Sequence, residues 1–147
     1  MTIQSRAGRT IFPPIVNGIL YFKFIGSLFT ASDWPVGSIP LFSFIAACCL
    51  AFFTGTSWGT LALLIPLSIP LATQIDAPIA TIQATVGAIF GGAVFGDHCS
   101  PISDTTVVSA FAADCDLKEH TKTQLPYAVL AAVLAAMLGY LPIALLY

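Results

Sequence analysis

A polar stretch between two apolar runs, residues 97–106, holds two carboxylates and several hydroxyl side chains. The carboxylates are Asp97 and Asp104. The hydroxyls belong to Ser100, Ser103, Thr105 and Thr106. Carboxylate and hydroxyl oxygens are the ligands that hard cations prefer, and two carboxylates in one site take up their protons in separate steps. The stretch is therefore predicted to bind a cation and a proton in alternation.

The two aspartates are expected to differ in role because Pro101 lies between them. Within a continuous helix, the proline ring would displace the carbonyl oxygen of Asp97 from its hydrogen bond and leave it free beside the carboxylate. Asp104 would then stand near the N-terminal end of a second half-helix, where partial positive charge stabilises an anion. Asp97 is therefore the better candidate for exchanging a proton for a cation.

Several neighbouring side chains allow two interpretations each. His98 either relays protons, since an imidazole changes charge near neutral pH, or forms a structural hydrogen bond. An earlier polar stretch, Thr54–Thr60, contains Thr56 and Ser57, which either add oxygen ligands or cap helix ends. A zinc site at His98 and Cys99 is not expected, because no second pair completes a tetrahedral set. We predict no cofactor, and no metal beyond the transported cation.

The elements that must position these residues are apolar. Hydrophobic residues make up 57% of the chain and charged residues only 8%, whereas soluble domains carry about 25% charged residues. Lipid is therefore the predicted solvent. The net charge of −2 leaves no basic patch for nucleic acid. The apolar segments are Ile11–Thr30, Ser38–Phe53, Leu61–Ile75, Ile79–Phe95 and Leu125–Tyr147.

The lengths of these segments predict an all-α membrane protein. Only Leu125–Tyr147 cleanly meets the requirement of roughly 20 apolar residues for a full span, and Pro126 falls in its first turn, where a missing N–H costs nothing. Short apolar pieces broken by Gly, Pro and hydroxyl residues are typical of discontinuous helices at a transporter site. We expect a re-entrant hairpin with Thr54–Thr60 at its tip and a helix broken at Asp97–Asp104. This arrangement resembles one repeat of an inverted-repeat secondary transporter.

The depth of the polar stretch and the orientation of the chain follow from its charges. Residues 97–104 could instead form a surface loop between two short helices, but the stretch lacks Lys and Arg and its flanking segments are short. Lys118 and Lys122 predict that the loop Asp114–Gln124 faces the cytoplasm. The first segment, Ile11–Thr30, also resembles a signal peptide or anchor, although prolines and a lysine interrupt it.

Glycines at a spacing of four residues predict closely packed helices. Gly87 with Gly91, and Gly92 with Gly96, form two such pairs in the fourth apolar segment. Small residues at this spacing allow the backbones of neighbouring membrane helices to approach each other. We therefore expect this segment to pack against another helix rather than to cross the membrane alone.

Three blocks of sequence resemble the NhaC family of Na⁺/H⁺ antiporters. They are Thr54–Thr60 followed by Pro66–Pro70, the long block Gly91–Thr106, and Thr123–Tyr127. The resemblance divides the chain into an N-terminal segment, residues 1–37, which matches poorly, and residues 38–147, which resemble the C-terminal portion of an antiporter. It implies a multi-pass carrier of the bacterial plasma membrane that exchanges Na⁺ for H⁺, with relatives that exchange organic acids or amino acids.

Family members are longer and contain two repeated halves, so the resemblance implies a truncated or partial transporter. A missing N-terminal half or a second copy of the chain would then complete the ion site. Two other hypotheses remain open, namely Na⁺-coupled exchange of an organic acid or amino acid, and a membrane fragment without transport activity. An enzyme is not expected.

Overall fold

The computed structural model describes residues 35–146, and these form helices and turns without any strand. The first predicted apolar segment, Ile11–Thr30, lies outside the described residues, so the proposed division near residue 37 stays a prediction. The elements in order are η1 (Val36–Ser38), α2 (Ile39–Thr54), α3 (Ser57–Gln74), α4 (Ile79–Cys99), α5 (Asp104–Ala112), α6 (Leu117–Ala135), η2 (Ala136–Tyr140) and α7 (Leu141–Leu146). The prediction of an all-helical chain is confirmed for this part.

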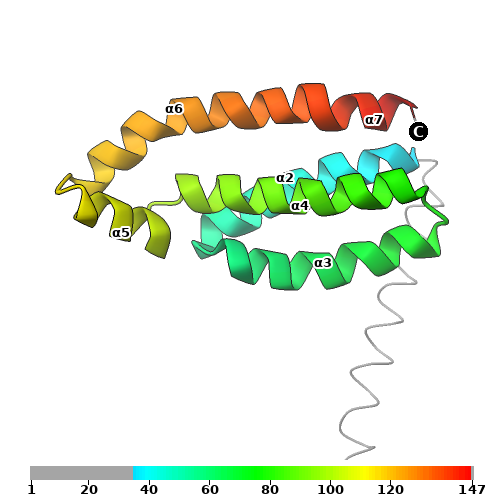
Figure 1. Ribbon diagram of the computed structural model, residues 1–147, viewed down its shortest axis with the longest axis horizontal. Coiled ribbons are helices and arrows are strands. Elements are labelled where there is room, and N and C mark those ends of the chain that lie inside the picture. Colours follow the sequence, from blue (N-terminus) through cyan, green and yellow to red (C-terminus); the bar gives the residue numbers. More distant parts are fainter. Residues whose placement is uncertain (1–34, 147) are drawn as a thin grey trace, which may run out of the picture. The chain divides into compact units, whose positions relative to one another are not determined.

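Helices α2 and α3 form an antiparallel hairpin, and α4 runs back beside α2 (Figure 1). The turn between α2 and α3 is tight because Gly55 adopts a left-handed backbone conformation with φ of 67°. Its N–H donates to the carbonyl oxygen of Ala51 and closes the last turn of α2. A residue with a Cβ atom would be strained in this conformation, whereas glycine adopts it readily.

The predicted glycine packing is confirmed for Gly92 and Gly96, which lie directly against α2. A Cβ atom on Gly92 would lie 2.5 Å from the carbonyl oxygen of Phe44, and one on Gly96 would overlap the carbonyl oxygen of Cys48. From Gly92 to Gly96 on α4, the contacted residue on α2 changes from Phe44 to Cys48, which is also four residues later. Helices α2 and α4 therefore lie side by side and run in the same direction. A Cβ on Gly87, in contrast, would meet no atom within 4 Å.

The predicted helix break exists but is shorter than expected. Helix α4 continues through Cys99 and α5 begins at Asp104, so only residues 100–103 are non-helical. Asp97 and His98 therefore belong to the last turn of α4. The prediction of a free Asp97 carbonyl oxygen is wrong, because the N–H of Ser100 donates to it at 3.2 Å. Pro101 falls in the turn and ends the helix rather than kinking it.

The last apolar segment begins earlier than the sequence predicts. Asp116 caps α6 by accepting hydrogen bonds from the N–H groups of Lys118 and Glu119 at 2.8 and 3.3 Å. The predicted loop Asp114–Gln124 is therefore mostly helical, and Pro126 lies inside α6 rather than in its first turn. Beyond Ala135 the helix passes through the π-helical turn η2 into α7 (Figure 1).

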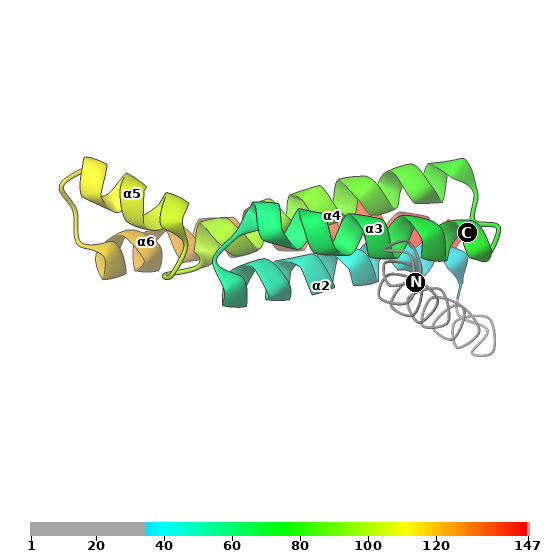
Figure 2. The same ribbon diagram turned by 90° about the horizontal axis from the view of Figure 1, so that it is seen from below.

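Three stretches of the described chain are long and apolar enough to cross a membrane. They are Val36–Thr54, Ile79–Cys99 and Leu117–Leu145. Helix α3 is not among them, although it packs against α2 and α4. The α2–α3 turn and the C-terminal end of α4 lie close together, whereas α5 and the first turns of α6 extend past them (Figure 2).

Candidate functional site

Asp97 is buried at the end of α4 and its carboxylate is surrounded by hydroxyl groups from α5. Its side chain is only 6% exposed. Ser103 Oγ lies 2.8 Å from Oδ1 of Asp97, and Thr105 Oγ1 lies 3.2 Å from Oδ2. The two hydroxyl oxygens are themselves 2.7 Å apart. We call these four oxygens of Asp97, Ser103 and Thr105 the Asp97 ring.

The local sequence explains why these side chains meet. Ser103 is the N-cap of α5 and accepts the N–H of Thr106 at 3.4 Å, which fixes the direction of its hydroxyl group. Thr105 follows in the first turn of α5. The four-residue break folds this turn back over the end of α4, so residues that are far apart along a continuous helix come together around one carboxylate.

The Asp97 ring contains three oxygen–oxygen contacts, but its two hydroxyl groups supply only two hydrogens. With an ionised carboxylate, one of the three contacts has no hydrogen between its oxygens. With a proton on Asp97, each contact has one, and the ring closes. The three contacts of this ring therefore each contain a hydrogen when the carboxylate carries one proton.

A second set of hydrogen bonds occupies the carbonyl groups at the end of α4. Thr106 Oγ1 lies 3.4 Å from the carbonyl oxygens of both Asp97 and His98. Gln124 of α6 donates to the carbonyl oxygen of His98 at 3.2 Å. These side chains satisfy backbone acceptors that a helix end leaves without intrahelical partners, and they connect α4 to both α5 and α6.

The break is also attached to the tip of the hairpin. Ser100 is fully buried and its hydroxyl group donates to the carbonyl oxygen of Phe52 at 2.8 Å. A Cβ on Gly55 would lie 2.9 Å from the carbonyl oxygen of Ile102. The end of α2 and the break therefore lie in direct contact, as the predicted meeting of the two polar stretches requires.

Other predicted site residues lie outside the Asp97 ring. Asp104 is exposed at the start of α5 and accepts the N–H of Thr105 at 2.8 Å. Thr56 caps α3 by accepting the N–H of Gly59 at 3.3 Å, which is the capping role that the sequence allowed. Ser57 is half-buried beside it, and His98 is exposed. Of the two predicted carboxylates, Asp97 is thus buried and Asp104 exposed.

Sequence reasoning missed three groups that contact or flank the break. They are the carbonyl of Phe52, the amide of Gln124 and the imidazole of His120. A backbone carbonyl leaves no signal in a sequence. Gln124 stands in the block Thr123–Tyr127 that carried the family resemblance, so that block offered a signal. His120 fell in a predicted loop, and its position beside α4 and α5 requires the earlier start of α6.

Removal of the Ser100 hydroxyl group should destabilise the contact between the break and the hairpin. In Ser100→Ala, the carbonyl of Phe52 loses its buried donor, which costs about 1 kcal/mol. We expect a lower thermal unfolding midpoint of the detergent-solubilised chain by circular dichroism. Thr123→Ala is the matched control, because the exposed Thr123 hydroxyl group bonds only to carbonyls of its own helix. Equal midpoints for both variants would contradict the expectation.

Comparisons with known proteins identify the family. The sequence model of the Na⁺/H⁺ antiporter family matches residues 20–143. Over 133 residues the chain is 37% identical to an uncharacterized protein of Haemophilus influenzae, with 90% of the chain and 25% of the relative covered. Over 92 residues it is 34% identical to the malate-2H⁺/Na⁺-lactate antiporter of Bacillus subtilis, with 60% of the chain and 19% of the relative covered.

A third relative, the Na⁺/H⁺ antiporter NhaC of Alkalihalophilus pseudofirmus, is 32% identical over 122 residues, with 79% of the chain and 24% of the relative covered. The chain thus spans about a quarter or less of the length of these relatives. No solved structure matches it significantly. Because the family match covers most of the chain and includes both polar stretches, the chain belongs to the Na⁺/H⁺ antiporter family.

Proposed function

We propose that this chain provides the ion-exchanging part of a Na⁺/H⁺ antiporter in the bacterial plasma membrane, with Asp97 as the group that binds either ion. The observation that carries the proposal is the Asp97 ring, in which a buried carboxylate contacts two hydroxyl groups. When a proton leaves Asp97, a Na⁺ ion replaces it, and the hydroxyl groups of Ser103 and Thr105 turn their lone pairs toward the ion.

Competition for one site couples the two ions. Either a proton or Na⁺ occupies Asp97, so the movement of one ion in each direction becomes an exchange. The C-terminal end of α4 supports a cation because its carbonyl oxygens carry partial negative charge. Thr56 and Ser57 at the hairpin tip, and Asp104 and Thr106 of α5, are the next oxygen groups that a small rearrangement would bring to the ion, and His98 lies beside them.

The arrangement of helices supports an ion site inside the membrane. Helix α5 has nine residues, about 13 Å of helix, between the break and the charged turn that follows. Its surface exposes Val107, Val108 and Phe111, which suits contact with lipid. The hairpin tip ends beside the break while α5 and α6 continue beyond it (Figure 2). We therefore propose that α2 and α3 form a re-entrant hairpin.

We propose that other protein segments supply part of the ion site. The Asp97 ring offers oxygens from one side, and the chain spans about a quarter of the length of its relatives. Since inverted-repeat transporters place their ion site between two repeats, we propose that a further segment or a second copy of the chain supplies the remaining ligands. We also propose that the α5–α6 end faces the cytoplasm, which the positive charges of Lys118 and Lys122 support.

Na⁺-dependent proton movement tests the proposed function. The chain is expressed in a bacterial host that lacks its own Na⁺/H⁺ antiporters, alone and beside an antiporter of full length, and everted vesicles are prepared. Respiration acidifies the vesicle interior, and addition of NaCl should then dissipate the pH gradient. Vesicles without the chain, prepared with and without the full-length antiporter, are the matching controls. A response to NaCl equal to that of the matching control in both expression settings, together with absent binding of ²²Na⁺ to the purified chain, would refute the proposal.

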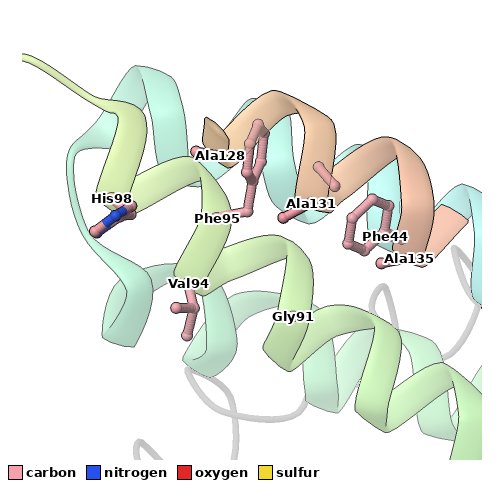
Figure 3. A pocket seen from close by; sticks show the side chains of 9 residues that line it. Phe44, Gly91, Val94, Phe95, His98, Ala128, Ala131 and Ala135 are labelled. Atoms are coloured by element: carbon pink, nitrogen blue, oxygen red, sulfur yellow. The ribbon is translucent and has the colours of Figure 1, made fainter. Parts of the chain in front are cut away.

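A second candidate is exchange of an organic substrate together with Na⁺, and one cavity favours it. A cavity of about 400 Å³ lies between α4 and α6, lined by Phe44, Gly91, Val94, Phe95, His98, Ala128, Ala131, Ala132 and Ala135. Phe44 and Phe95 extend toward the alanines of α6, and His98 stands at one end (Figure 3). Its volume lies in the range of small-molecule sites, and one relative is named as a malate and lactate antiporter.

The two candidates differ in what dissipates the gradient. For Na⁺/H⁺ exchange, NaCl alone is sufficient. For the second candidate, dissipation needs an organic anion such as lactate or malate inside or outside the vesicles in addition to Na⁺. Ala132→Phe fills the cavity from α6 and should block the second reaction only, so loss of NaCl-driven exchange in this variant would count against a simple Na⁺/H⁺ antiporter.

A further inference from the structure

A small polar pocket adjoins the Asp97 ring on the side of α6. Its volume is about 70 Å³, and its lining residues are His98, Thr105, Thr106, Ser109, His120 and Gln124. Every one of these side chains has a hydrogen-bonding group. Because a water molecule takes about 30 Å³ of liquid volume, the pocket has room for about two waters, which its wall can hold by hydrogen bonds.

Thr105 connects this pocket to the carboxylate. Its hydroxyl group bonds to Asp97 Oδ2 and its side chain also lines the pocket. Of the α5 residues that line the pocket, Thr105 and Ser109 are exposed, whereas Thr106 is 4% exposed. Asp97 itself is buried, so an ion that reaches its carboxylate from this side passes Thr105.

The two faces of α5 differ in polarity. Thr105 and Ser109 lie one helical turn apart and both line the pocket. Val108, next to Ser109, is 65% exposed and does not line it. The polar face of this short helix is thus directed at the pocket, whereas the apolar residues are available for contact with lipid.

Resting on the proposed function, we propose that this pocket is a hydrated access site through which Na⁺ and protons reach Asp97 from the side of the membrane that carries Lys118 and Lys122. The site holds water and a partly hydrated monovalent cation. Its outer wall consists of His120 and Gln124 of α6, and its inner boundary is Thr105. Gln124, which donates to the carbonyl of His98, keeps α6 at the pocket.

Thiol labelling tests the hydration of the pocket. Chains with a single cysteine are prepared by replacing the native cysteines with alanine and introducing Ser109→Cys or Val108→Cys. Inside-out vesicles are treated with a positively charged, membrane-impermeant methanethiosulfonate reagent. Because a thiol reacts as its thiolate, which forms in water and not in lipid, Ser109→Cys should react at least about tenfold faster than its neighbour. A chain that retains only Cys115, which is exposed in the α5–α6 turn, is the positive control.

The effect of Na⁺ tests whether the ion uses this route. Replacing choline by Na⁺ at constant ionic strength should slow labelling of Ser109→Cys at least about twofold by occupancy of the site, and should leave Cys115 unchanged. His120→Cys, with Leu130→Cys as its lipid-exposed control, repeats the comparison from the opposite wall if Ser109→Cys does not fold. Equal labelling of pocket and control positions, or labelling that Na⁺ does not change, would overturn the route.

Binding of ²²Na⁺ to the same chains separates this inference from the function on which it rests. If Asp97-dependent binding is intact and labelling fails to respond to Na⁺, ions reach Asp97 by another path and only the access site is refuted. If the chain with Asp97 intact binds no ²²Na⁺, both proposals fail together.

Discussion

Asp97→Asn is expected to abolish Na⁺-dependent proton movement. The amide has nearly the shape of the carboxyl group but neither carries a negative charge nor exchanges a proton. The Asp97 ring would then bind a cation much more weakly, because its remaining oxygens, an amide carbonyl and two hydroxyl groups, carry no net charge. Binding of ²²Na⁺ to the purified chain should weaken by at least about tenfold, or about 1.4 kcal/mol, and NaCl should no longer dissipate the pH gradient of everted vesicles.

The matched control is Asp114→Asn, the same chemical change at an exposed turn. Asp114 has a φ of 50°, a left-handed conformation that asparagine also adopts readily. This variant should retain exchange and Na⁺ binding. Equal amounts of both variants in the membrane show that the chain inserts. If Asp97→Asn exchanged ions as well as the control does, the carboxylate of Asp97 would not be the ion-binding group.

Gly96→Val should disrupt the packing of α4 on α2. A Cβ atom on Gly96 would overlap the carbonyl oxygen of Cys48 and approach the Cβ of Ala51 to 2.8 Å. The close atoms are mostly backbone, so no side-chain rotation relieves the overlap and the helices must separate. Overpacking of this kind costs about 1–3 kcal/mol. The expected result is a much lower thermal unfolding midpoint and loss of the chain from the monodisperse peak in size-exclusion chromatography.

Gly87→Val provides the control for this prediction on the same helix. A Cβ on Gly87 would meet no atom within 4 Å, so the new side chain faces open space in the described part of the chain. Both variants change the helix propensity of α4 equally, and only one changes its contact with α2. If the two variants unfolded at the same temperature, the close approach of α2 and α4 would not contribute to stability.

Much of the helical arrangement could be predicted from local sequence. The spacing of Gly92 and Gly96 predicted close helix packing because small residues act through direct backbone contact. Pro101 predicted the break because it has no N–H to donate. The start of α6 was missed because an apolar-segment criterion ignores polar helical turns. Asp116 caps a helix that begins at Leu117, eight residues before the apolar run.

The candidate site was predicted by residue type but not in its geometry. Asp97, Ser103 and Thr105 do meet, as a hydroxyl-rich stretch beside a carboxylate suggested. Asp104 does not join them, because the direction of each side chain depends on how the four-residue turn folds back, and no periodicity describes such a turn. The sequence allowed Thr56 to be either an oxygen ligand or a helix cap. The hydrogen bond from the N–H of Gly59 to its hydroxyl group shows the capping role.

The bond from Ser100 to the carbonyl of Phe52 has a mechanical consequence. While it persists, the non-helical turn cannot shift unless the end of α2 shifts with it, so these two parts are expected to move together. Helix α6 has no buried residue over its length and is attached at this end through Gln124. In the described part of the chain, relative movement therefore costs the least free energy between α6 and the packed helices α2 and α4. Such movement requires the hydrogen bond from the Gln124 amide to break.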